Sequence, residues 1–526
     1  MTGRNTPRPR RAGVLIPLFS LRSDEGFGLG EIPDLRAYAE WSAAAGLSVV
    51  QMLPVAAVNP GETSPYSAAT AFAIDPAYLG LAECEDFAAI GGLSALSDGD
   101  RRLLDELKAS PTVQWARLRP LKERAMRAAF AHFLAKEWKP KTKRQRQLAA
   151  FRQENAAWLE DFALFWVLHG KFQAHWKDWD PPLADRAPAA LAKASTAYQD
   201  DLLYVAWQQW QLDEQWRQAR AHANALGVEL MGDLPFVMAG DSADVWKDRH
   251  LFKPGMRVGV PPDALCADGQ DWGLPLYDWA ALARTNFEWM HHRAARSGRL
   301  FGMYRVDHVI GMYRTYYRSE NGKSSGFSPV EEDDQIQLGE TLLSIMGAYG
   351  EVIAEDLGLL PEFLRPSLSR LRVPGYLVLR WEKHDSWRDG RHQSDFRDPA
   401  GWPAISVATS GTHDTETQAV WYDQLSPDQR RDVFRIGGLA TLDPNRPFHD
   451  EARDRLLEVL YRSPSELCLL PFQDLLGHRE QVNVPGTVNE GNWTYRMPMT
   501  LASLRGDGET TARLLRFSEA SGRKTR

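Results

Sequence analysis

The sequence predicts a parallel (β/α)8 TIM barrel, an α/β fold, with a large and mainly helical insertion near the mouth of the barrel. Three apolar, strand-like runs each end in a carboxylate beside other polar groups, at Asp307, Glu355 and Asp414. Their intervals fit one long and then two ordinary strand–helix units of about 30 residues. Because the carboxyl ends of barrel strands share one face, we expect the carboxylates after strands four, five and seven, around one pocket.

Length and composition agree with this fold class. The chain has 526 residues, of which 44% are hydrophobic and 25% charged, which suits a globular barrel with an insertion. The net charge of -7 gives no general attraction to nucleic acid or to anionic membranes, so we predict neither as a partner. No apolar run approaches the roughly 18 residues of a membrane span. The three cysteines form no CxxC pair, which indicates reduced thiols in a cytoplasmic protein.

Eight short apolar runs supply the predicted barrel strands. With the turns that follow them, these runs span residues 13–19, 47–54, 229–237, 301–311, 352–358, 375–381, 405–410 and 466–474. The predicted catalytic barrel therefore comprises residues 13–80 and 227–526.

Residues 81–226 lack the strand pattern and show apolar residues at helical spacings of three and four. We predict that they form the helical insertion and cover one side of the barrel mouth. The cationic segment at residues 139–146 is expected to be a solvated loop, with a polyanion site as the alternative. Residues 1–12 are basic and are not followed by a secretory hydrophobic region, so they are predicted to be a disordered tail.

The segment FGMYRVDHVIG, residues 301–311, places Arg305, Asp307 and His308 where a strand ends. A neighbouring guanidinium should keep the Asp307 carboxylate ionised, which suits a nucleophile. A structural alternative is that Asp307 caps the next helix and pairs with Arg305.

Two loops carry candidate substrate contacts. Tyr66 lies among small residues at 64–75, where its ring could stack on a sugar or simply take part in packing. Residues 258–279 are rich in Gly and Pro and hold Gln270 and Trp272 near their tip. Such a loop could bind hydroxyl groups and shield a site, or it could be a structural connection stiffened by prolines.

This set of residue types favours chemistry at a glycosidic bond. The oxocarbenium-like transition state needs one carboxylate as nucleophile or base and one protonated carboxyl as acid. Asp307 suits the first role, and Glu355, which follows an apolar strand, suits the second through a raised pKa. Asp414, beside His413, could bind sugar hydroxyls as the ring distorts. A divalent metal site on these carboxylates and histidines is the alternative, although the chain has no HxH or HExxH pair to fix two ligands.

The order of six motifs resembles the 4-α-glucanotransferases, the amylomaltase or disproportionating-enzyme family, glycoside hydrolase family 77 of the α-amylase clan. The motifs are SPYSAATAFAIDP, GDLPFVMAGDSADVW, GVPPDALCADGQDWGLPLYDW, RVDH, IAEDLG and GTHDT. The resemblance implies retaining transfer of an α-1,4-glucan segment to the 4-hydroxyl of an acceptor glucan or glucose. Asp307 would be the nucleophile, Glu355 the acid/base and Asp414 the stabiliser of the transition state, with no metal and no cofactor.

The resemblance also implies the substrate contacts. A retaining mechanism implies Asp307 and Glu355 carboxyl groups about 5 to 5.5 Å apart. The expected contacts are Tyr66, Asp233, Arg305, His308 and His413 at the donor site, Gln270 and Trp272 on the closing loop, and Asn483 on the acceptor side.

Four positions depart from the usual motifs of the family, and none is a carboxylate: Val309, Ile310, Leu274 and Gln481. These departures leave open an α-glucan hydrolase or a transglycosylase with a different acceptor on the same framework. A glucan-binding protein without activity is a further alternative, and it predicts the loss of a catalytic carboxylate, whereas all three are present.

Overall fold

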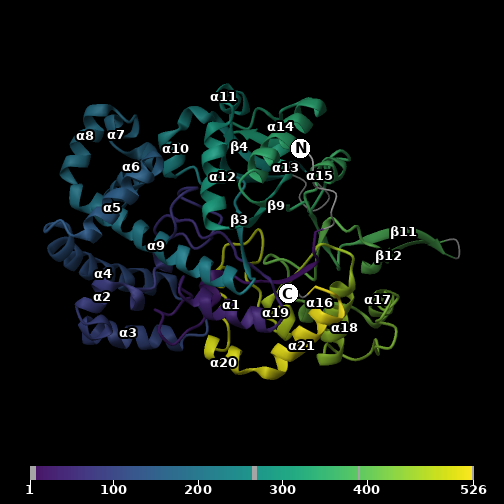
Figure 1. Ribbon diagram of the computed structural model, residues 1–526. Helices are drawn as coiled ribbons and strands as arrows, with labels where there is room; N and C mark the ends of the chain where they lie inside the picture. The colour runs from purple at the N-terminus through teal and green to yellow at the C-terminus, as the bar shows by residue number, and fades with distance from the viewer. Residues whose placement is uncertain (1–7, 263–268, 389–390, 524–526) are drawn as a thin grey trace.

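The computed structural model describes residues 8–262, 269–388 and 391–523. Its centre is a closed barrel of eight parallel strands, so the predicted fold class is confirmed (Figure 1). Asp307, Glu355 and Asp414 follow its fourth, fifth and seventh strands, as predicted. In barrel order the strands are β1 (Arg11–Leu15), β2 (Val49–Gln51), β3 (Glu229–Leu234), β6 (Met303–Val306), β9 (Glu351–Ala354), β10 (Gly375–Val378), β13 (Ser406–Thr409) and β14 (Leu467–Pro471).

The barrel interior is a packed core. Seven of the eight strands contribute buried apolar side chains to one cluster, namely Val49, Met231, Met303, Ile353, Tyr376, Val407, Leu467 and Leu469. Strand β1 contributes Gly13 instead, where an added Cβ would come within 2.6 Å of the Val49 carbonyl oxygen. The side chains therefore fill the barrel and close it to solvent at this level.

A polar layer lies directly above this apolar layer because side chains alternate along a strand. Three members of the apolar layer are each followed, two residues later, by a charged residue on the same inner face. The charged residues are Asp233 after Met231, Arg305 after Met303 and Glu355 after Ile353. Strands β3 and β6 pair in a register that sets Asp233 beside Arg305. The barrel register thus assembles charged groups at its carboxyl end.

Helices pack around the barrel, and one of them comes from the region predicted as an insertion. Helix α9 (Gln199–Ala225) packs against α1 (Asp34–Ala44) and strand β3, in the place of the outer helix between the second and third barrel strands. The other outer helices include α12 (Glu288–Leu300), α14 (Glu332–Gly347), α15 (Leu364–Leu371), α18 (Asp450–Arg462) and α21 (Gly508–Ala520). The predicted insertion, residues 81–226, therefore includes one helix that belongs to the outer ring of the barrel.

The rest of residues 81–226, all of which the structure describes, contains helices and no strand. These helices lie to one side of the barrel, at the left of Figure 1. The cationic segment differs from the predicted solvated loop, because Arg144 is in a helix and pairs with the buried Asp86 at 2.7 Å. The helices of this region are α2 (Glu85–Ala89), α3 (Asp98–Ala109), α4 (Trp115–Phe133), α5 (Lys143–Glu154), α6 (Ala156–Phe172), α7 (Pro181–Ala184) and α8 (Pro188–Ala197).

Two strands of a four-stranded antiparallel sheet occupy described residues of the segment 258–279, where a long loop was predicted; residues 263–268 of that loop lie outside the described residues. The order of the sheet is β5 (Gln270–Tyr277), β4 (Phe252–Val260), β7 (Thr315–Ser319) and β8 (Ser325–Ser328). The Gly and Pro content of β4 and β5 is typical of loops, so the sequence did not predict them as strands. Pro275 is accommodated because β5 is an edge strand and its register with β4 is irregular.

The amino-terminal segment also differs from its prediction. Strand β1 begins at Arg11, inside the predicted tail, and the guanidiniums of Arg8 and Arg11 bind the Glu351 carboxylate at 2.8 and 2.7 Å. Because Glu351 lies far along the chain, the local sequence gave no sign of these contacts and the segment was predicted to be disordered. Residues 1–7 lie outside the described residues.

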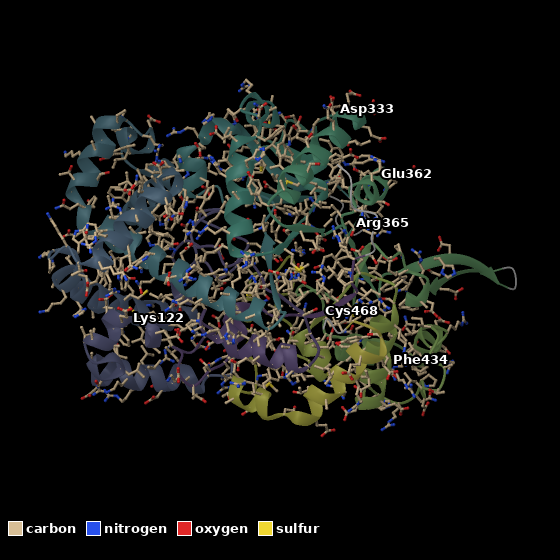
Figure 2. All side chains as sticks on the ribbon, viewed as in Figure 1. Lys122, Asp333, Glu362, Arg365, Phe434 and Cys468 are labelled. Carbon is tan, nitrogen blue, oxygen red and sulfur yellow. The ribbon has the colours of Figure 1, made fainter. Side chains whose placement is uncertain are left out.

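Two further predictions from composition can be compared with the structure. Cys84 and Cys468 are buried free thiols, the second on barrel strand β14 (Figure 2), whereas Cys266 is outside the described residues. Within the described ranges, no helix has the length and hydropathy needed to cross a membrane.

A hairpin of β11 (Lys383–Arg388) and β12 (Arg391–Phe396) projects from the body at the right of Figure 1.

A buried ion pair joins helix α4 to the loops around the barrel. The Lys122 ammonium contacts the Glu31 carboxylate and donates to the carbonyl oxygens of Ala77 and Leu79 at 2.7 and 2.6 Å (Figure 2). Both charged side chains are almost fully buried. Burial raises the pKa of Glu31 to about 7, with Lys122 acting in the opposite direction.

We expect Lys122→Ala to lower the free energy of unfolding by about 3–5 kcal/mol, because it leaves a buried carboxyl and two carbonyl groups without their partner. Arg124→Ala on the same helix is the matched control. It removes an exposed ion pair with Asp100 and should cost less than about 1 kcal/mol. Urea unfolding of both variants measures the difference, and similar losses in both would contradict the assignment.

Candidate active site

Arg305 is the centre of the polar layer at the carboxyl end of the barrel. Its guanidinium donates to both Asp233 oxygens at 2.8 Å and pairs with the Asp307 carboxylate at 2.8 Å. A longer contact of 3.9 Å reaches Glu355. Burial alone would lower the pKa of Arg305, but Asp233 and Asp307 hold that pKa well above its usual range. Arg305 is therefore a permanent buried cation shared by three carboxyl groups.

Asp307 and Glu355 meet this cation in different surroundings. The Asp307 side chain contacts the guanidinium closely and is a quarter exposed, whereas Glu355 is more distant and more buried. Burial raises the pKa of Glu355 to about 7; Arg305 opposes this shift, and the Asp307 charge adds to it. One carboxyl thus has the environment of a proton donor near neutral pH, beside a second that is paired with a cation.

The turn after strand β6 holds Glu355 in place. The backbone N–H of His308 donates to the Glu355 carboxylate at 2.8 Å, and the N–H of Val309 donates to the Glu355 carbonyl at 3.1 Å. His308 has φ of 45°, in the left-handed region that costs a residue with a side chain about 1–3 kcal/mol. This strained turn points one backbone donor at the carboxyl that follows the next strand.

Asp414, after strand β13, has a hydrogen-bonded setting of its own. It pairs with the His413 imidazole at 3.3 Å and accepts the Asn483 side-chain N–H at 2.6 Å. Burial would raise the pKa of Asp414, but His413 and Asn483 outweigh it and lower that pKa to about 2. Asp414 is therefore ionised throughout the neutral range, with its side chain 40% exposed to an incoming ligand.

Tyr66 joins the Arg305 group to the Asp414 group. Its hydroxyl donates to Asp233 at 2.8 Å, and its ring stacks on His413 with centroids 5.2 Å apart. The indole of Trp493 packs against both rings, at 5.7 Å from Tyr66 and 5.9 Å from His413. The packing alternative for Tyr66 is thus partly correct, because its ring already has two aromatic neighbours.

Strand β5 brings Trp272 over the site. The Trp272 indole packs edge-on against the His308 ring with centroids 4.8 Å apart, and its N–H donates to the Gln270 side-chain oxygen at 3.0 Å. Gln270 is therefore connected to the site by its hydrogen bond with Trp272, which in turn packs on His308. Burial lowers the pKa of His308, so its imidazole is neutral beneath this cover.

Three contributors to the site were not among the predicted contacts. Gln481 donates its side-chain amide to the carbonyl oxygens of Asp414 and Asn483, at 3.2 and 2.6 Å. The Tyr376 hydroxyl donates to Gln51 at 3.2 Å below the charged layer. Gln481 was noted only as a departure from the family motif, and Trp493 was not singled out as a contact. Their contacts join distant loops, so local sequence gave no signal of them.

The other departures from the family motif lie in the turn after Asp307 and on strand β5. Val309 is fully buried in the turn after Asp307, Ile310 is half-buried beside it, and Leu274 is half-buried on β5. Among the described residues, no group of three or more His, Cys, Asp or Glu side chains has an arrangement that could hold a metal ion.

Comparisons with known proteins identify one family. The family model described as 4-alpha-glucanotransferase matches residues 16–501. A 4-alpha-glucanotransferase of Thermus thermophilus is 32% identical, over 96% of this chain and 99% of its own. One from Chlamydia pneumoniae is 28% identical, over 94% of this chain and 92% of its own.

Solved structures agree at the level of the fold. An amylomaltase from Streptococcus agalactiae in complex with acarbose superposes with a TM-score of 0.82 at 24% identity, over 98% of this chain and all of that one. An amylomaltase from Corynebacterium glutamicum gives a TM-score of 0.78 at 21% identity, over 98% of this chain and 75% of that one.

The Glu355 carboxyl should titrate near pH 7 when followed by 13C NMR of labelled glutamate side chains. Because the Asp307 charge contributes to the raised pKa, Asp307→Asn should lower it. Activity that requires protonated Glu355 should correspondingly fall as pH rises through about 7. Titration near the ordinary value of about 4.3, or no response to Asp307→Asn, would contradict this description.

Proposed function

Because the chain belongs to the 4-alpha-glucanotransferase family, we propose that it transfers segments of α-1,4-glucans between chains by double displacement through Asp307. The observation that carries the mechanism is that one buried guanidinium contacts both Asp307 and Glu355, while their surroundings differ. Retaining transfer requires one carboxylate as nucleophile and one protonated carboxyl as acid.

In the first step, Asp307 attacks the anomeric carbon of the donor glucan. The bond from that carbon to the leaving glucan breaks, and Glu355 gives its proton to the departing oxygen. Arg305 pairs with the attacking carboxylate at 2.8 Å. The products of this step are a covalent glycosyl ester on Asp307, a shortened glucan with a free 4-hydroxyl, and an ionised Glu355.

In the second step, Glu355 acts as a base. It takes the proton from the 4-hydroxyl of an acceptor glucan or glucose, and that oxygen displaces Asp307 from the anomeric carbon. A pKa of about 7 suits both directions of this proton transfer. Two inversions at one carbon leave its configuration unchanged, so an α-linkage is made from an α-linkage.

Asp414 is proposed to stabilise the transition state. Its carboxylate is held ionised by His413 and Asn483, and its partly exposed side chain can bind sugar hydroxyls more tightly as the ring distorts. Asp233, Tyr66, His308 and His413 are proposed to line the donor site, and Asn483 the acceptor side.

Strand β5 is proposed to keep water from the covalent intermediate. Trp272 covers His308 next to the nucleophile, with Gln270 behind it. Removal of water from this position favours an acceptor hydroxyl over hydrolysis. A hydrolase on the same framework is the second candidate, because it would use the same carboxylates and differ only in whether water or a sugar hydroxyl reaches the intermediate.

The proposed partners are α-1,4-glucans and maltooligosaccharides, and the proposed compartment is the cytoplasm, as free buried thiols suggest. The mechanism requires no cofactor, because Asp307 and Glu355 together supply the nucleophile and the proton.

Incubation with maltotriose alone tests the proposed reaction. Transfer should release glucose and build maltotetraose and longer chains, which chromatography resolves. Accumulation of glucose and maltose without longer products would instead identify a hydrolase, and no change in the substrate would contradict both reactions.

Asp307→Asn should lower the transfer rate by at least about 10⁴-fold while the fold remains intact, because the amide cannot form the ester. Asp333→Asn, an exposed position on α14 (Figure 2), is the matched control and should retain full activity. Rates on maltotriose and circular dichroism compare the two variants. Substantial activity in Asp307→Asn would assign the nucleophile elsewhere.

A further inference from the structure

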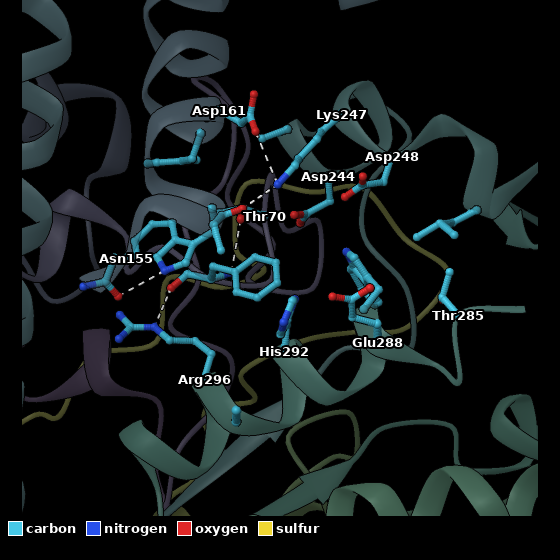
Figure 3. A pocket seen from close by; sticks show the side chains of 18 of the residues that line it. Thr70, Asn155, Asp161, Asp244, Lys247, Asp248, Thr285, Glu288, His292 and Arg296 are labelled. Carbon is cyan, nitrogen blue, oxygen red and sulfur yellow. Dashed lines mark hydrogen bonds and ion pairs between the residues drawn. The ribbon is translucent and has the colours of Figure 1, made fainter. Parts of the chain in front are cut away.

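A cavity lies away from the candidate active site, between helices α6, α10 (Ala243–Lys247) and α12 (Figure 3). Its volume of about 500 Å³ is within the range of small-molecule sites, roughly 300–1,000 Å³. None of the residues that line it belongs to the group around Arg305 and Asp414. Any ligand held there would therefore occupy a separate site.

Aromatic side chains form the apolar wall of this cavity. Phe72 and Trp158 stack with centroids 6.2 Å apart, and Trp289 stands nearly perpendicular to Phe72 at 6.3 Å. Flat apolar surfaces of this kind suit a compact ligand with an apolar face, such as a sugar ring.

Two polar side chains of the lining have unused hydrogen-bonding capacity. Asp244 is about 95% buried, and its Oδ2 accepts the Ala71 N–H at 2.6 Å, while its Oδ1 has no hydrogen bond among the described residues. The Trp289 side chain is similarly buried, and its indole N–H has no partner in the described ranges. A buried donor without a partner costs about 1–3 kcal/mol. A hydroxyl group has the chemistry to pair with either of them, because it can both accept and donate a hydrogen bond.

The charges of the lining select against an anion. The lysine and arginine side chains of the lining already have partners: Arg296 and Arg299 bind Asp213 at 2.7 and 2.9 Å, and Lys247 binds Asp161 at 3.3 Å. Asp244, Asp248 and Glu288 have no ion pair among the described residues, and Figure 3 shows Asp244 and Asp248 facing Glu288 and His292.

The protonation of this group fits a neutral ligand. Burial raises the pKa of Asp244 to about 7 and also raises the pKa of Asp248. Near neutral pH the lining can therefore both donate to and accept from hydroxyl groups, and its remaining negative charge repels phosphates and carboxylates.

We propose that this cavity binds a short neutral saccharide independently of the site at Arg305. The aromatic wall takes an apolar face of the sugar, and the Asp244 carboxyl and the Trp289 indole bind its hydroxyls. The cavity also adjoins the loop that carries Tyr66, since Thr70 and Phe72 line it and the Ala71 N–H binds Asp244. A bound sugar would contact the rear of that loop.

The test follows individual tryptophans by 19F NMR in full-length Asp307→Asn protein labelled with 5-fluorotryptophan, which binds saccharides without turning them over. Signals are assigned by Trp→Phe substitution. Trp158 and Trp289 report this cavity, and Trp272 and Trp493 report the site at Arg305. Maltose and maltotriose are the probes. We expect both pairs of signals to shift, each with its own saturation curve.

Matched variants make the test specific. Ala157 lines the cavity and Ala156 does not, although both are exposed at the start of α6. Ala157→Phe should weaken saccharide binding at Trp158 and Trp289 by about tenfold or more, whereas Ala156→Phe should not. Glu288→Gln, which leaves packing unchanged, should weaken saccharide binding at Trp158 and Trp289 by several-fold. All three should leave the Trp493 titration unchanged.

Three results would overturn the proposal. The Trp158 and Trp289 signals could stay fixed while saccharide saturates Trp493. They could shift equally in the Ala157→Phe and Ala156→Phe proteins. They could respond to 1,4-diaminobutane or to inorganic phosphate but not to maltose, which would identify a cation or anion site. Because binding is measured in an inactive variant, none of these outcomes depends on the proposed transfer reaction.

Discussion

The arrangement of the barrel mouth depends on one buried cation. Arg305 is nearly inaccessible to solvent and contacts Asp233, Asp307 and Glu355, which come from three adjacent strands or their ends. A buried charge is tolerated only when its partners compensate for lost hydration, and loss of one member of such a pair typically costs 3–5 kcal/mol. The strand register that brings these groups together is therefore also what makes their burial possible.

The same cation separates the chemical roles of two similar residues. Asp307 contacts it directly, while Glu355 lies farther away, deeper, and next to the Asp307 charge. A strained turn at His308 fixes the distance between them by giving a backbone N–H to Glu355. Asp414 is controlled by other groups, His413 and Asn483. Tyr66 links the two groups by donating to Asp233 and stacking on His413, and Trp493 packs against both rings.

The sequence was sufficient for the barrel and for the placement of the three carboxylates, because each follows an apolar run whose position is a local property. It was insufficient where contacts join distant segments. The pairing of Arg8 with Glu351, the bonds from Gln481 to the Asp414 loop, and the cavity between α6 and α12 leave no local pattern. Strands β4 and β5 were read as a loop because prolines usually exclude strands, whereas an edge strand with irregular pairing accommodates them.

The central claim, that Asp307 forms a covalent bond with the donor, is tested most directly by trapping that bond. In Glu355→Gln, a maltosyl fluoride donor needs little protonation of its leaving group, but transfer from the intermediate lacks its base. Rapid denaturation, proteolysis and mass spectrometry then locate any added maltosyl group. The account predicts a maltosyl ester on the peptide that contains Asp307. An adduct on another residue, or none while fluoride is released in a burst, would contradict it.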